Sequence, residues 1–168
     1  MSKKLYEVAA IIPLIPEATD INPGVDLDSF KMANFERCCV LIQFSAALTG
    51  DNVLVVNVGA AADAKTTTMT FRYRLGSAAP KVATADVYGT EATSAALTLA
   101  AATYQGKTLL IEFTAAEVQA AAEAYAIPFD GNWITIGLDG SASVGTAMAW
   151  AILTGPRQGK ATQATQIA

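Results

Sequence analysis

The sequence predicts a mainly β protein: an antiparallel, jelly-roll-like β-sandwich with one short helix at about 114–126 and extended N- and C-terminal arms. From residue 37 onward, apolar residues alternate with period two, the pattern of half-buried strands. Turn signals recur about every 8–12 residues, which is typical of a sandwich or barrel. We expect one domain, with an arm at 1–24, the sandwich at 25–154 and a tail at 155–168.

The N-terminal arm is apolar but interrupted by Pro13, Pro16 and Pro23. Each proline removes a backbone donor and fixes φ, so the segment is excluded from the centre of a sheet. We expect mainly an extended arm that docks on another subunit or on a partner protein, since about 15 residues reach roughly 50 Å. The alternative is that the arm covers an edge of the chain's own sheet. Its apolar residues are Leu5, Val8, Ile11, Ile12, Leu14 and Ile15.

The first strands of the sandwich are expected at 37–46, 53–58 and 69–75. Residues 37–46, RCCVLIQFSA, are almost continuously apolar, which predicts a strand buried on both faces. The turn signal at 48–52 predicts that the next strand pairs with it as a hairpin. In MTFRYRL, residues 69–75, the apolar side chains share one face, while Arg72 and Arg74 share the other.

The second half of the sandwich contains the one predicted helix. Thr114 followed by Glu117 is a capping box, and Pro128 ends the helical pattern. The Asp-Gly-Ser turn at 139–141 predicts that the last two strands form a hairpin. The apolar face of the helix consists of Val118, Ala122 and Tyr125. The remaining strands are expected at 82–88, 95–100, 107–113, 132–138 and 146–153.

The composition excludes several functional classes. A net charge of −4 with scattered basic residues argues against nucleic-acid binding. No apolar run approaches the ~18 residues of a transmembrane helix. The N-terminal apolar stretch is broken by proline and has no suitably placed cleavage site, so we expect it to belong to the mature protein. There is no histidine, which removes the commonest general base and metal ligand.

The two cysteines, Cys38 and Cys39, are adjacent. Neighbours in a strand point to opposite faces, so no disulfide between them is expected. Two cysteines alone do not complete a zinc site. We expect free, apolar thiols in a reducing compartment; the alternative is a reactive thiol.

No constellation of catalytic or cofactor-binding residues stands out. GPRQGK, residues 155–160, has three residues between its glycines where a phosphate loop has four. Asp26 and Asp28 lack the rest of a calcium loop. Trp150 shares a strand face with Met148 and Ile152, which predicts a core position. We therefore expect no enzyme, no cofactor and no metal site.

Four stretches form a pattern that spans almost the whole chain and is vaguest at 76–106. They are MSKKLYEVAAIIPLIP, MANFERCCVLIQF, TMTFRYRLGSAAP and AWAILTGPRQGKATQATQIA, with ILTGPR at 152–157 the most distinctive piece. This pattern resembles the capsid decoration proteins, or cement proteins, of tailed bacteriophages. The resemblance implies a virion protein on the outer surface of the phage head that binds major capsid protein as a homotrimer. It also implies assembly in the host cytoplasm and a role in capsid stabilisation, with no membrane partner.

Partner contacts are expected from three places. The first is the apolar arm, and the second is the pair Arg72 and Arg74, which would face solvent or meet acids on another subunit. The third is the cationic tail, through Arg157 and Lys160, for which an acidic capsid surface is a suitable partner.

Three alternatives to a decoration protein remain. One is another virion component, such as a tail or head-completion protein. Another is a carbohydrate-binding jelly-roll module, which needs an exposed aromatic residue in a concave site. The third is a histidine-free hydrolase, which needs two acids within ~10 Å in a cleft. The aromatic candidates for sugar binding are Trp133, Trp150, Tyr88 and Tyr104.

Overall fold

The computed structural model describes residues 5–21, 24–32, 34–128, 132–139, 145–156 and 167. The predicted mainly β fold is confirmed. The helices in this part of the chain are α1 (Leu5–Val8), α2 (Ala101–Tyr104) and α3 (Ala115–Ala124). None of them is long and apolar enough to span a lipid bilayer. The strands are β1 (Ala9–Asp20), β2 (Gly24–Asp26), β3 (Phe30–Lys31), β4 (Phe35–Phe44), β5 (Asn52–Gly59), β6 (Thr67–Met69), β7 (Phe71–Leu75), β8 (Ala92–Ser94), β9 (Ala96–Leu99), β10 (Thr108–Thr114), β11 (Trp133–Asp139) and β12 (Thr146–Pro156).

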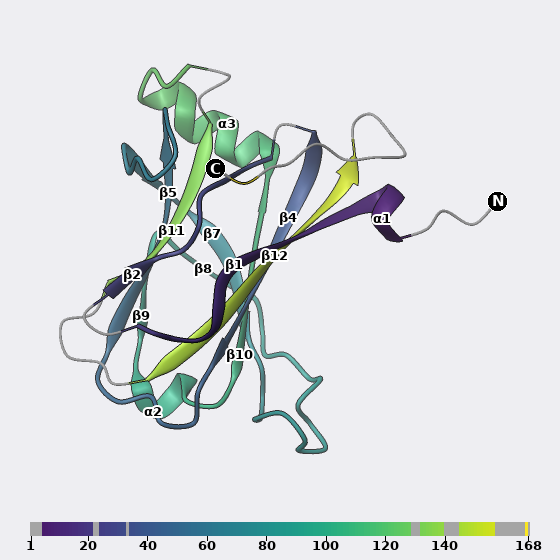
Figure 1. The fold of residues 1–168 in the computed structure, drawn as a ribbon, viewed down its shortest axis with the longest axis vertical. Helices are drawn as coiled ribbons and strands as arrows, with labels where there is room; N and C mark the ends of the chain where they lie inside the picture. Colours follow the sequence, from purple (N-terminus) through teal and green to yellow (C-terminus); the bar gives the residue numbers. More distant parts are fainter. Residues whose placement is uncertain are drawn as a thin grey trace.

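Two antiparallel sheets pack against each other as a β-sandwich (Figure 1). The first sheet has the order β1-β12-β4-β10-β7-β8. The second is built on β11 and β5, with β2 and β3 on different parts of β11, and β6 and β9 on different parts of β5. Their inner faces share one core. Its largest fully buried side chains include Phe30, Phe35, Phe44, Phe71 and Phe113.

The chain crosses between the two sheets at three places where the sequence predicts a hairpin or one continuous strand. β4 and β5 lie in different sheets, and so do β11 and β12, so both predicted hairpins are wrong. The predicted strand 69–75 also divides at Thr70 into β6 of the second sheet and β7 of the first. Turn residues specify a chain reversal, but they do not specify which strand accepts the hydrogen bonds afterwards.

Two further strand predictions differ from the structure. β4 is buried on one face only, because Cys39, Leu41 and Gln43 on its other face are half-buried. The strand predicted at 82–88 is wrong, because these residues form turns. Their β pairing is a single isolated bridge between Gly76 and Tyr88. Strands at 95–100 and 107–113 are confirmed as β9 and β10.

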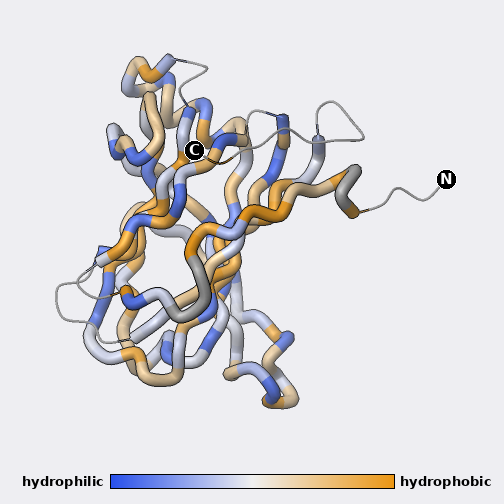
Figure 2. Tube along the Cα trace, in the orientation of Figure 1, coloured by the Kyte–Doolittle hydropathy of each residue, from blue (hydrophilic) through white to orange (hydrophobic). Residues whose placement is uncertain are grey.

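The N-terminal segment covers an edge of the chain's own sheet, the alternative to a free arm. β1 pairs with β12 from Ala9 to Asp20, so the sandwich begins near residue 9 rather than 25 and ends with β12 at Pro156. Figure 2 shows hydrophobic residues along the first part of β1. A partner-contact role for Ile12, Leu14 and Ile15 is wrong, because all three are buried in the core. The register shift between Pro13 and Ile15 lets adjacent residues 14 and 15 both be buried.

The predicted helix is confirmed as α3, with both hydrogen bonds of the capping box between Thr114 and Glu117. Val118 and Ala122 are buried, and α3 contacts strands of both sheets. The prediction that Tyr125 belongs to the buried face of the helix is wrong, because its side chain is 61 % exposed. The reason is that the helix ends at Ala124, so Tyr125 takes the C-cap conformation and leaves the helical face.

Candidate functional site

The outward side of the first sheet contains two rows of side chains in register across five strands, which together we call the outer face. Neighbouring strands lie about 4.8 Å apart, so each row spans about 19 Å. The first row is Pro13, Trp150, Leu41, Leu110 and Arg74, and the second is Ile11, Ile152, Cys39, Glu112 and Arg72, from β1, β12, β4, β10 and β7 respectively.

The half of the outer face on β1 and β12 is apolar and accessible. Ile11 is 57 % exposed and Trp150 is 36 % exposed, with Leu41 and Ile152 half-buried beside them. The prediction that Trp150 packs in the core is wrong, because β12 turns Ala149 and Ala151 inward instead. An apolar patch with an exposed tryptophan is typical of a protein-binding surface.

The other half of the outer face is charged and internally paired. Arg72 forms a bidentate ion pair with Glu117, at 2.5 and 3.1 Å, and Arg74 lies 3.3 Å from Glu91. Arg72 and Arg74 were expected to face solvent or to meet acids on another subunit. In the structure both pair with acids of their own chain. Burial would raise the pKa of Glu117, but hydrogen bonds from Arg72 and Thr114 outweigh it and lower that pKa.

The outward side of the second sheet is covered in part by the chain itself. Ser29 donates to the Asp63 carboxylate at 3.0 Å and lies 2.7 Å from the Thr135 hydroxyl. The Asp63 N–H donates to the Ser29 hydroxyl, which ties the loop after β5 onto this sheet. Asp26, considered for calcium, is 2.6 Å from the Lys65 ammonium. Polar contacts within the chain therefore occupy part of this side.

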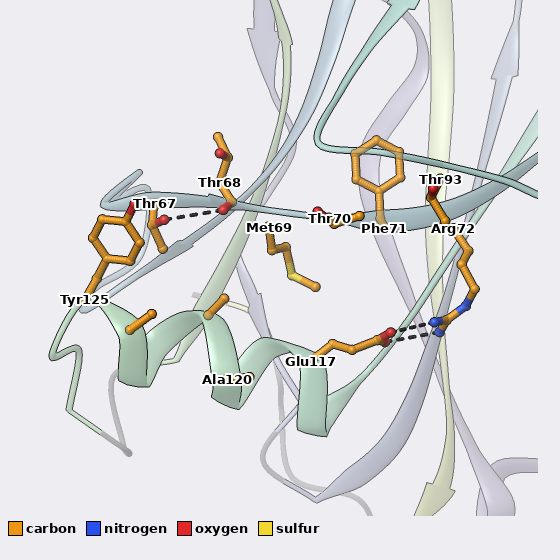
Figure 3. Close-up of a pocket in the computed structure, with 12 residues that line it drawn as sticks. Thr67, Thr68, Met69, Thr70, Phe71, Arg72, Thr93, Glu117, Ala120 and Tyr125 are labelled. Atoms are coloured by element: carbon orange, nitrogen blue, oxygen red, sulfur yellow. Dashed lines mark hydrogen bonds and ion pairs between the residues drawn. The ribbon is translucent and has the colours of Figure 1, made fainter.

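The aromatic residues proposed for sugar binding do not gather in one place. Tyr104 is buried against Phe44, and Tyr88 and Trp133 are half-buried. The Lys31 ammonium lies 4.5 Å from the centre of the Trp133 ring. Trp150 is exposed, but on the outer face. Tyr125 is an exposed aromatic residue that lines a groove (Figure 3). The sequence pattern had assigned it to the buried face of the helix.

Both cysteines are free. Burial raises the pKa of the Cys38 thiol, with the Cys39 thiol adding to it. Burial together with Glu112 raises the pKa of Cys39 to about 11. Because the thiolate is the reactive species, these values oppose the alternative of a reactive thiol.

The remaining predicted contacts have different outcomes. Leu5 is 65 % exposed and Val8 is half-buried, so Leu5 stays accessible to a partner along with Ile11. Arg157 and Lys160 lie outside the described residues. Across the ranges that the structure describes, no three His, Cys, Asp or Glu side chains lie close enough together to hold a metal ion.

Comparisons with known proteins add no assignment: no family model, no curated protein and no solved structure matches this chain.

Proposed function

We propose that this chain is a non-enzymatic virion protein that binds the outer surface of a phage head through the apolar half of its outer face. The observation that carries the proposal is the row from Pro13 through Trp150 to Leu41 and Leu110. These apolar residues lie on a regular sheet rather than in a cleft. The resemblance of the sequence to capsid decoration proteins supplies the expected partner, major capsid protein.

The proposed mechanism is binding across a junction between capsid subunits. A ligand that binds the assembled shell and not the free subunits stabilises the shell by mass action. Many copies on one head, each joined as a homotrimer, multiply a modest contact by avidity. Ile11 belongs to the second row of the outer face, and Leu5 on α1 is a further exposed apolar residue before β1.

The contribution of Trp150 follows from its exposure. A tryptophan side chain has about 250 Å² of surface, so the 36 % that is exposed corresponds to about 90 Å². At about 25 cal/mol per Å², covering that area contributes about 2 kcal/mol per site. Replacing Trp150 with alanine therefore weakens each contact roughly 30-fold.

The test is co-sedimentation with heads of the phage that encodes the chain, assembled without it. Wild type is expected to pellet saturably with heads, and Trp150→Ala to need much higher concentrations. Val53→Ala is the matched control, because Val53 is 37 % exposed on the second sheet and should pellet like wild type. The proposal is contradicted if all three proteins pellet equally with heads, or if wild type does not pellet with heads at all.

The oligomeric state is tested by light scattering on a size-exclusion column. A trimer supports binding at three-fold positions of the head. A ring of another symmetry favours the alternative of a tail or head-completion protein.

A further inference from the structure

A groove of about 410 Å³ lies between α3 and the strands β6 and β7 (Figure 3). It is on the β7–β8 side of the first sheet, separated from Trp150 by β4 and β10. The groove is therefore distinct from the apolar half of the outer face, and ligand binding in the groove does not depend on whether that face binds a capsid.

The two ends of the groove carry side chains of different chemistry. Tyr125 stands at one end, and the ion pair of Arg72 with Glu117 stands at the other (Figure 3). Glu117 and Tyr125 are separated by two turns of helix, so the groove is about 12 Å long. Its size fits a small ligand rather than a protein surface.

The walls of the groove combine methyl groups with hydroxyl groups. Ala120, Ala121 and Ala124 line the helix side, and their small side chains keep the groove open. The strand side presents threonines, of which Thr68, Thr70 and Thr93 are exposed. Each hydroxyl is able to donate one hydrogen bond and accept others.

The charges of the groove cancel. Arg72 and Glu117 neutralise each other, so neither an anion nor a cation is favoured over a neutral ligand. The guanidinium of Arg72 keeps N–H donors beyond the two used in the pair, whereas the Glu117 carboxylate already accepts from Arg72 and from Thr114. A neutral ligand with many hydroxyls is able to accept from the guanidinium.

We propose that this groove binds a neutral carbohydrate of about two sugar rings, with one ring stacked on Tyr125. A sugar has an apolar C–H face for the exposed tyrosine ring and the alanine methyls. It also has hydroxyls for the threonines and the ion pair. Tyrosine suits this position because its ring is apolar on the face and polar at the tip.

An extended peptide fits the groove less well. A peptide that adds to a sheet gains most from main-chain hydrogen bonds along a free edge. β6 is three residues long, so its edge offers few such bonds, and the Thr67 hydroxyl donates to the Thr68 carbonyl at 3.3 Å. The groove therefore favours a ligand that bonds to side chains.

The test is saturation-transfer NMR and titration of the whole chain with maltose, cellobiose, lactose and N,N′-diacetylchitobiose. At least one disaccharide is expected to bind, and Tyr125→Ala to weaken it at least about tenfold. Tyr125→Phe is expected to retain binding, because stacking needs the ring and not the hydroxyl. Tyr125 is exposed, so both variants should fold, which circular dichroism checks.

Trp150→Ala is the control, since it removes an exposed aromatic residue outside the groove. The proposal is overturned if no disaccharide binds, or if binding is lost in Trp150→Ala and kept in Tyr125→Ala. A peptide of residues 1–16 serves as the extended-chain probe. If it shifts the amide resonances of β6 and the sugars do not, the groove is a peptide site and the proposal is wrong.

Discussion

Glu117 connects α3 to two strands of the first sheet: to β10 through Thr114 and to β7 through Arg72. Its carboxylate accepts hydrogen bonds from the Thr114 N–H at 2.7 Å and the Thr114 hydroxyl at 2.8 Å, and it also pairs with Arg72. Replacing Glu117 with alanine removes all of these at once. α3 buries Val118 and Ala122 at the end of the sandwich, so loosening its first turn weakens the packing there.

The expected loss of stability has two parts. The hydrogen bonds that the Glu117 carboxylate accepts from the N-cap residue Thr114 are worth about 1 kcal/mol. The ion pair is partly solvent-exposed, with side chains 32 % and 38 % exposed, so it contributes up to about 1 kcal/mol. Glu117→Ala should therefore cost about 1.5–2 kcal/mol, and Arg72→Ala about 0.5–1 kcal/mol. For a domain of this size, Glu117→Ala corresponds to a fall in Tm of about 3–8 °C.

The assay is a double-mutant cycle of Glu117→Ala and Arg72→Ala by urea denaturation, with Tm measured in parallel. The coupling free energy should be about 0.5–1 kcal/mol. Glu123→Ala is the matched control on the same helix, because Glu123 is exposed and its carboxylate accepts a hydrogen bond from the Gln119 side chain rather than from a strand or a cap residue. Equal losses for the Glu117 and Glu123 variants would refute the reasoning.

The pH dependence follows from the lowered pKa of Glu117. A carboxylate with a lowered pKa stabilises the fold above its ordinary value of 4.5, and this stabilisation is lost as the pH falls through the lower folded-state value. The stability difference between wild type and Glu117→Gln should therefore shrink as the pH falls from about 6 to below the ordinary pKa of 4.5. A difference that stays constant over that range contradicts the assignment.

Three further predictions concern single positions. Cys39, with a pKa of about 11, should react with iodoacetamide at pH 8 roughly 100-fold more slowly in the folded chain than in urea; equal rates contradict its burial. Gly59→Ala should cost about 1–3 kcal/mol, because a Cβ there would lie 2.1 Å from the Ala64 carbonyl oxygen. Gly89→Ala, with its nearest contact at 3.6 Å, should be close to neutral in the same denaturation series. Asn52→Val should raise stability by about 1 kcal/mol, since the buried Asn52 amide has no hydrogen-bond partner among the described residues; a loss in Tm would show that the amide is satisfied.

The strands and the helix cap were predictable because they depend on local patterns. Period two identified β10 and β12, and two residues three positions apart identified the start of α3. The prolines correctly excluded β1 from the sheet centre. The assignment of strands to sheets was not predictable from turns, because β12 pairs with the distant strands β1 and β4, and β5 pairs with the distant β11 as well as with the neighbouring β6.

The candidate sites were harder to predict because both depend on which face a strand or helix turns inward. β12 has apolar residues on both faces, and the face that Trp150 shares with Met148 and Ile152 was predicted to lie inside. In the structure the alanines face inward, and Ala147 lies opposite Phe44 in register, so small residues make room for large ones. Tyr125 was assigned to the helix core because its spacing fits, but the helix ends one residue earlier.

The most direct test of capsid binding is cryo-electron microscopy of heads incubated with the chain. We expect added density on the outer surface of the head, with the first sheet turned toward the shell and Trp150 at the contact. The groove beside Tyr125 should stay open to solvent. Heads without added density, or sandwiches bound with Trp150 facing away from the shell, would contradict the proposed function.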